Sequence, residues 1–179
     1  MVIKDRTNVL LTERLELRPL TAQDAGFLFD LYTDPEVIRY TGETRLRDEA
    51  HAREFLDRCT AMPASHPPVY LISIVGEEKK SGWCGLRYDD EDQVFDLGFR
   101  LERTSWGKGY ATEAARAVME EAFGQYGLIR IRARCARENI GASHVLLKLG
   151  FKAVRSFTAH GYLCDEYALE RHELPIGRN

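Results

Sequence analysis

Several features are missing from this sequence of 179 residues, and their absence excludes whole classes of protein. Cysteine is scarce, and no Cys-x-x-Cys pair occurs, so we expect neither a disulfide framework nor a zinc ribbon. The histidines never show His-x-x-x-His spacing, and we therefore expect no metal site. We interpret the four cysteines as buried thiols in a reducing cytoplasm: Cys59, Cys84, Cys135 and Cys164.

Long apolar runs are also absent. No stretch is apolar enough to span a bilayer, and the start of the chain lacks the basic-then-apolar pattern of a signal peptide. A formal net charge of -3 gives no overall attraction to nucleic acid or to an anionic membrane. The sequence contains no internal repeat and no Gly/Ser linker. We therefore expect a cytoplasmic protein with one domain over residues 1–179, and no nucleic-acid or membrane partner.

The pattern of apolar residues predicts a mixed α/β chain. Alternation predicts strands at 15–19, 69–75, 83–88, 94–101, 129–135, 151–157 and 162–169. Helical spacing and capping signals predict helices after Asp24, Asp34 and Asp48, from the glycine loop to about Tyr126, and from about Ile140 to Leu149.

A glycine-containing loop, Trp106–Thr112, lies between a predicted strand and a predicted helix. Gly107 and Gly109 let the backbone approach a ligand closely, and the first helical turn exposes unpaired N–H groups, so the loop is a candidate phosphate site. Lys108 adds a cation. A tight strand-to-helix turn without a ligand is the alternative. The loop lacks the Gly-Lys-Ser/Thr ending of a P-loop and the third glycine of a dinucleotide fold.

Four blocks in the same order resemble one family. Residues 95–101 followed by 106–114 resemble the acetyl-coenzyme A motif of the GNAT acetyltransferase superfamily, most closely its RimJ/RimL-type N-terminal acetyltransferase branch. Residues 12–20 resemble the N-terminal segment of that branch, Asn139 to Phe151 the coenzyme-contacting helix and the strand after it, and residues 165–169 the last strand. Trp106 replaces the Gln/Arg of the family signature, as is typical of this branch.

The resemblance implies a GNAT fold. This is an α/β (α+β) domain with one mixed, mostly antiparallel sheet of about six to seven strands, flanked by about four helices. Acetyl-CoA would bind between splayed central strands, without a metal. The loop would hold its pyrophosphate through backbone N–H groups, the strand beside it would contact the pantetheine arm and the thioester, and Asn139 would contact the coenzyme from the other side. The implied coenzyme-binding residues are Phe99, Arg100, Leu101, Trp106, Gly107, Lys108, Gly109, Tyr110, Ala111, Thr112 and Asn139.

Two residues are candidates for proton transfer. Asp96 is the leading general base, because relatives carry an acid at this step of the strand; a solvated carboxylate or a partner for Arg100 is the alternative. Many relatives place a tyrosine acid at the position aligned with Leu146, and leucine cannot donate a proton. Some Rim-type members use a serine where this chain has Ala142. The neighbouring Ser143 is therefore the candidate acid, and a plain surface serine is the alternative.

The implied reaction is direct attack of a primary amine on the thioester, with backbone N–H groups stabilising the oxyanion. The first candidate acceptor is the α-amine of a protein N-terminus. A small amine (a polyamine, amino acid or aminoglycoside) is the alternative, and the acidic residues 89–92 favour a cationic one. A non-catalytic acyl-CoA-binding module is the third possibility. The protein is expected to be a monomer or homodimer, with Tyr40, Thr41 and Gly42 as candidate pocket residues.

Overall fold

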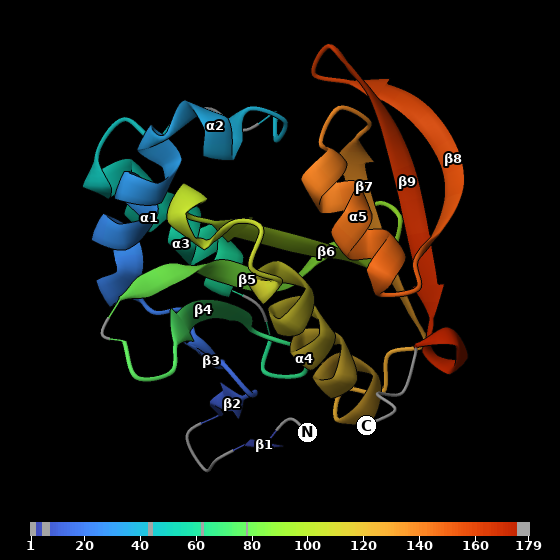
Figure 1. Cartoon of the computed structure of the whole chain (residues 1–179), viewed down its shortest axis with the longest axis horizontal. Helices are drawn as coiled ribbons and strands as arrows, with labels where there is room; N and C mark the ends of the chain where they lie inside the picture. Colours follow the sequence, from blue (N-terminus) through green and yellow to red (C-terminus); the bar gives the residue numbers. More distant parts are fainter. Residues whose placement is uncertain (1–2, 5–7, 43–44, 62, 78, 175–179) are drawn as a thin grey trace.

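The computed structural model describes residues 3–4, 8–42, 45–61, 63–77 and 79–174, which form one nine-stranded sheet with helices on both faces (Figure 1). The strands are β1 (Ile3–Lys4), β2 (Leu10–Leu11), β3 (Leu15–Pro19), β4 (Val69–Ile74), β5 (Lys80–Asp89), β6 (Val94–Leu101), β7 (Arg130–Ala136), β8 (Lys152–Ala159) and β9 (Tyr162–Glu170). The helices are α1 (Ala25–Thr33), α2 (Pro35–Ile38), α3 (Glu49–Thr60), α4 (Tyr110–Gly124) and α5 (Ile140–Lys148). Three short 3-10 helices are η1 (Ala22–Asp24), η2 (Arg103–Ser105) and η3 (Arg171–Glu173).

The strand order is β1-β2-β3-β4-β5-β6-β7-β9-β8. All neighbouring pairs are antiparallel except β6 and β7, which are parallel, so the predicted mixed, mostly antiparallel sheet is confirmed. The seven strands expected from alternation are present. The two additional strands, β1 and β2, have two residues each and are too short for alternation to reveal.

The two faces of the sheet carry different helices (Figure 1). On one face α1, α2 and α3 cover a core that includes Leu28, Leu56 and Trp83. On the other face α4 and α5 cover a core that includes Met119 and Leu97. Trp83 is only 2% exposed and forms part of the first of these cores.

Asp24 anchors the helices of the first face to the sheet. The predicted capping box with Thr21 is present. The fully buried carboxylate also accepts hydrogen bonds from Arg18 Nη1 and Nη2 at 2.8 and 2.6 Å and from Lys80 Nζ at 3.0 Å. Burial by itself would raise the pKa of Asp24, but the bonds from Arg18, Thr21 and Lys80 outweigh it and lower that pKa. The entry to α1 is therefore tied to β3 and β5.

Two expectations concern location. None of the helices in the described ranges has the length and apolar character that a membrane crossing requires. The prediction that no signal peptide is present depends on the start of the chain, and of residues 1–7 the structure describes only Ile3 and Lys4. That prediction stays a prediction.

Candidate active site

The glycine loop turns sharply into α4. Gly107 and Gly109 have φ values of +73° and +84°, in the left-handed region that favours glycine, and Gly109 is the N-cap of the helix. The first N–H that bonds along α4 is that of Glu113, to the Gly109 carbonyl at 3.1 Å. The N–H groups of residues 110–112 therefore have no acceptor within the helix and carry its positive dipole end. This is the geometry of an anion site.

Trp106 and Arg14 hold the loop in place. Trp106 Nε1 donates to the Leu101 carbonyl at 2.7 Å, which ties the loop to the end of β6. Arg14 Nη1 donates to the Lys108 carbonyl at 3.0 Å, its Nε donates to Glu113 at 2.7 Å, and its guanidinium carbon lies 4.9 Å from the centroid of the Tyr110 ring. The sequence blocks include Arg14 but give it no role, because its partners lie more than ninety positions away.

Glu113 completes this clamp from the first turn of α4. It accepts hydrogen bonds from the Thr12 hydroxyl at 2.6 Å and from the Arg14 N–H at 2.9 Å. Burial would raise the pKa of Glu113, but the bonds from Thr12 and Arg14 prevail and lower it. The Glu113 carboxylate therefore stays charged and keeps the segment before β3 attached to the start of α4, next to the glycine loop.

One cavity of about 840 Å³ connects this loop with the other face of the sheet. Strands β6 and β7 pair only through Phe95 with Ile131 and Asp96 with Arg132. Beyond that point they diverge, and the cavity lies between residues 97–101 of β6 and 133–136 of β7. Its other walls are the start of α4, α5, the end of α2 and the tip of the β8–β9 hairpin.

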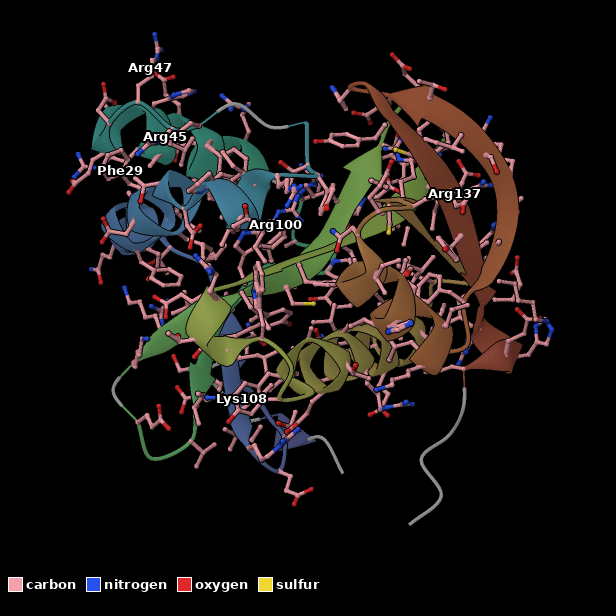
Figure 2. The ribbon with its side chains drawn as sticks, turned by 45° about the horizontal axis from the view of Figure 1, so that its top comes forward. Phe29, Arg45, Arg47, Arg100, Lys108 and Arg137 are labelled. Atoms are coloured by element: carbon pink, nitrogen blue, oxygen red, sulfur yellow. The ribbon has the colours of Figure 1, made fainter. Side chains whose placement is uncertain are left out.

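Most of the predicted coenzyme-binding residues line this cavity, but Lys108 does not. Figure 2 shows Lys108 at the N-terminal end of α4, on the side of the helix away from α5. Its carbonyl is held by Arg14, whereas its side chain is exposed. The residues that line the cavity are 99–101, 106–107, 109–112 and Asn139, whose Oδ1 also caps α5 by accepting from the Ala142 N–H at 3.1 Å.

Asp96 is not among the lining residues, although it lies beside the cavity. It is 8% exposed, and its carboxylate accepts hydrogen bonds from Arg132 Nε at 2.6 Å and from Arg132 Nη2 at 2.9 Å. Arg134 Nη2 donates to it as well, at 2.5 Å. Both oxygens of the Asp96 carboxylate therefore accept hydrogen bonds from guanidinium groups. The sequence suggested Arg100 as an alternative partner for Asp96, but these bonds come from Arg132 and Arg134.

The acidic residues at the β5–β6 turn belong to the same cluster. Asp89 accepts from Arg132 Nη2 at 2.6 Å, and Asp92 also pairs with Arg132. The pKa of Asp89 is lowered by a hydrogen bond from the Asp92 N–H and by the two arginines. These carboxylates neutralise arginines of β7, which weakens the argument from the sequence that they attract a cationic acceptor.

The candidate acid, Ser143, is not among the residues that line the cavity. Its hydroxyl donates to the Ile140 carbonyl at 3.0 Å, a bond within α5. Leu146 and Ala142, which occupy the positions aligned with the tyrosine and serine of relatives, do line the cavity. At these two aligned positions the wall is apolar and offers no proton donor.

Away from the glycine loop, the cavity is lined by residues of α2 and of the β8–β9 hairpin. Figure 1 shows these two elements on opposite sides of the upper part of the molecule. Tyr40 and Thr41 line the cavity, as expected, whereas Gly42 lines a neighbouring smaller cavity. The ring of Tyr40 meets that of Tyr162 edge to face, with centroids 5.4 Å apart. A side-chain carbon added at Gly42 would lie 2.2 Å from Cδ2 of His160. The segment after α2 is therefore in contact with the β8–β9 hairpin.

Two cysteines, Cys135 and Cys164, line the cavity as well. Burial raises the pKa of Cys135 to about 11 and also raises that of Cys164, so both thiols are protonated at neutral pH. All four cysteines are free and buried, as expected. The described residues contain no group of three His, Cys, Asp or Glu side chains arranged for a metal ion.

Comparisons with known proteins agree with this geometry. The family model described as "Acetyltransferase (GNAT) domain" matches residues 14–152. The N-acetyltransferase p20 of Bacillus licheniformis is 32% identical over 164 residues, which are 88% of this chain and 92% of that protein.

Solved structures share the fold. An acetyltransferase (GNAT family) from Bacillus anthracis superposes with a TM-score of 0.78 at 24% identity, covering 92% of this chain and 99% of that one. RimL, a ribosomal L7/L12 alpha-N-protein acetyltransferase solved with coenzyme A, superposes with a TM-score of 0.75 at 16% identity, covering 89% and 95%. The family match, the fold and the cavity between β6 and β7 together lead to one conclusion: the chain belongs to the GNAT acetyltransferases, a family that uses acetyl-CoA, and is an N-acetyltransferase.

Proposed function

We propose that this protein, as one domain over residues 1–179, transfers the acetyl group of acetyl-CoA to the α-amine of a polypeptide N-terminus, as enzymes of the RimJ/RimL-type branch do. The observation that carries the proposal is the continuous cavity that passes between β6 and β7. The cavity connects the start of α4, which can bind an anion, on one face of the sheet with an open space on the other face. Side chains of α2 and of the β8–β9 hairpin line that space. A donor and an acceptor can therefore meet in the gap between the two strands.

On the donor side, backbone groups would do most of the binding. The N–H groups of residues 107–112 would hold the pyrophosphate, and the diverging edge of β6 at residues 99–101 would contact the pantetheine arm. Asn139 would approach from α5, and Lys108 would contribute through its backbone. Acetyl-CoA supplies an activated acetyl thioester. A backbone N–H of β6 placed at the thioester oxygen would stabilise the charge that develops there.

On the acceptor side, the amine must be neutral before it attacks. An α-amine has a pKa of about 7.7–8.0, against about 10.4 for a lysine-type amine, so far more of it is neutral near pH 7.5. The exposed Arg39 in the cavity wall disfavours a charged amine further, because like charges repel and its surface pair with Glu36 is weak. Among the described lining residues the carboxylates are Glu36 and Glu138. Such a site suits an acceptor that needs little help from a general base.

Asp96 then has a different role from the predicted base. Because its oxygens are bound by Arg132 and Arg134, we propose that it is a positioning residue that fixes Arg134 at the cavity wall. Ser143, bonded within α5, contributes little to proton transfer under this proposal. The thiolate of coenzyme A, with a thiol pKa near 8.5, leaves without a strong acid.

The test is coenzyme A thiol release from acetyl-CoA across a panel of acceptors. The panel contains hexapeptides with free N-termini, the same peptides with blocked N-termini and one internal lysine, polyamines, free amino acids and aminoglycosides. Release with free N-termini and not with blocked peptides supports the proposal. Release only with a polyamine or an aminoglycoside would replace it with a small-amine enzyme.

A further inference from the structure

The acceptor half of the cavity is lined by four arginines from four separate elements. Arg39 follows α2, Arg87 lies on β5, Arg100 on β6 and Arg134 on β7. Among the described residues that line this half, the carboxylate is Glu36, which pairs with Arg39 at 3.3 Å while both side chains are about half exposed. Asp96 does not line the cavity, but it lies opposite Arg87 and pairs with Arg134. An exposed pair of this kind is weak and leaves Arg39 available to another anion.

The strand register brings Arg87 and Arg100 to the same face of the sheet, on either side of Gly98. Arg87 is opposite Asp96, and Gly85 is opposite Gly98. The side chains of Arg87, Asp96 and Arg100 therefore fall on one face of the sheet, which Gly98 leaves open between them. A side-chain carbon at Gly98 would lie 3.2 Å from Cη2 of Trp83, which explains why glycine occupies this position. At Gly98 the acceptor half of the cavity is therefore bounded by the backbone of β6, with guanidinium groups beside it.

The side chain of Arg134 is held in place by ion pairs. Both of its ion pairs, with Asp96 at 2.5 Å and with Asp89 at 3.3 Å, use Nη2. The same carboxylates hold the buried Arg132 next to it. This network fixes the direction of the Arg134 guanidinium at the wall of the cavity.

A second cavity of about 620 Å³ continues the positive surface. Arg87 lines both cavities, and the second adds Arg47, Arg58 and His51, whereas none of its described lining residues is acidic. Figure 2 shows Arg100 in the central part of the molecule near α2 and Arg47 at the outer margin beside α3. The cationic surface therefore extends outward from the point where the acetyl group would be transferred.

We propose that the preferred acceptor is a polypeptide whose first residues include aspartate or glutamate, and that Arg39 and Arg87 recognise those carboxylates. This inference rests on the proposed function and names the substrate class for the same site. Guanidinium groups bind carboxylates through parallel, charge-assisted hydrogen bonds, so they give both affinity and direction. The same positive charge keeps the attacking α-amine neutral.

The second cavity favours a polypeptide over a free acidic amino acid. An extended chain advances about 3.3–3.6 Å per residue, so a peptide held by its N-terminus between β6 and β7 would pass several residues beyond the first cavity. Arg47 and Arg58 lie on that continuation. A free amino acid would use only the first cavity.

The experiment is steady-state kinetics with hexapeptides that differ in one position. One series has Glu, Gln or Lys at position 2, another has the same three residues at position 5, and free glutamate is included. For the native enzyme we expect kcat/KM to be about ten- to a hundredfold higher with Glu than with Gln at position 2, and lower again with Lys. Glutamate at position 5 gives a smaller gain, and free glutamate is a poor acceptor.

Variants assign the effect to residues. Arg39→Gln and Arg87→Gln should each remove most of the preference for Glu at position 2, and Arg87→Glu should reverse it in favour of Lys. Arg47→Gln should reduce only the gain at position 5. Arg53→Gln is the matched control, because Arg53 is an exposed arginine of α3 that lines neither cavity. An unchanged KM for acetyl-CoA in each variant shows that the fold is intact.

Equal rates with Glu and Gln peptides would overturn the inference while leaving the proposed function in place. A Glu preference that survives Arg39→Gln and Arg87→Gln would overturn the assignment to these residues, and free glutamate as the best acceptor would overturn the choice of a polypeptide. No turnover with any α-amine would overturn the proposed function itself.

Discussion

The two halves of the cavity are assembled in different ways. The half proposed to hold the coenzyme comes largely from one stretch of chain, residues 97–112, and presents backbone N–H groups at the start of α4. The acceptor half takes side chains from α2, β5, β6, β7 and the β8–β9 hairpin. A backbone site accepts one kind of ligand whatever side chains surround it, whereas a site made of side chains changes with each substitution. The comparison explains how one family can keep its donor and vary its acceptor.

The largest effect is expected at the anchor of the acceptor-side helices. Asp24→Asn should lower the free energy of unfolding by about 3 kcal/mol, because it breaks a buried ion pair whose partners, Arg18 and Lys80, remain partly exposed. The folded-state pKa of Asp24 is depressed, so its contribution is present above the unfolded value of about 3.9 and is lost as pH falls below it.

Urea unfolding at pH 7 and at pH 3 measures this. The difference between the native protein and the variant should be smaller at pH 3. A difference that is the same at both pH values would contradict the depressed pKa, and Arg53→Gln provides a surface control.

The next effect is expected in the coenzyme half. Gly109→Ala should raise the KM for acetyl-CoA about tenfold, since a non-glycine residue at φ +84° costs about 1–2 kcal/mol and the loop would relax away from its anion-binding shape. Gly76→Ala is a matched control, because Gly76 has φ +82° in the β4–β5 turn, away from the cavity. Both variants should lose similar stability, and only the first should change KM. A similar change in KM for both would show that strain alone is responsible.

A smaller effect is expected from the clamp behind the loop. Arg14→Ala should raise the KM for acetyl-CoA a fewfold and leave kcat nearly unchanged, because the side chain is partly exposed and acts through the Lys108 carbonyl and Glu113. Isothermal titration with coenzyme A measures the same loss without catalysis. A fall in kcat with unchanged KM would argue that Arg14 acts on the reaction and not on the loop.

The smallest effect on turnover separates the two roles considered for Asp96. If Asp96 positions Arg134, Asp96→Asn should change kcat less than about threefold with neutral α-amine acceptors, and it should weaken the preference for acidic peptides. A general base would show a loss of about a hundredfold or more and an altered pH profile of kcat/KM. Measuring kcat/KM from pH 6 to 9 with a Gln peptide and a Glu peptide distinguishes the two roles.

Local features of the sequence were sufficient for the coenzyme half. Gly107 and Gly109 stand next to a helix start, and their positive φ values and the exposed N–H groups follow from residues that are neighbours in the chain. The capping signal before the helix that follows Asp24 is likewise predicted from a short pattern. Interactions of this range are fixed by propensity and periodicity, so seven of the nine described strands, the five helices and the glycine loop could be predicted from the residues alone. The mixed, mostly antiparallel arrangement of the sheet was predicted only from the family resemblance.

Which charged side chains pair with one another depends on the tertiary fold. Asp96 and Arg132 are 36 positions apart, and they face one another because β6 and β7 pair in parallel at that point and diverge just beyond it. Arg39 and Arg134 reach one cavity from α2 and β7 for the same kind of reason. A side chain's role depends on which partners share its face of the sheet, and register and helix packing set those partners across distances that no local pattern encodes.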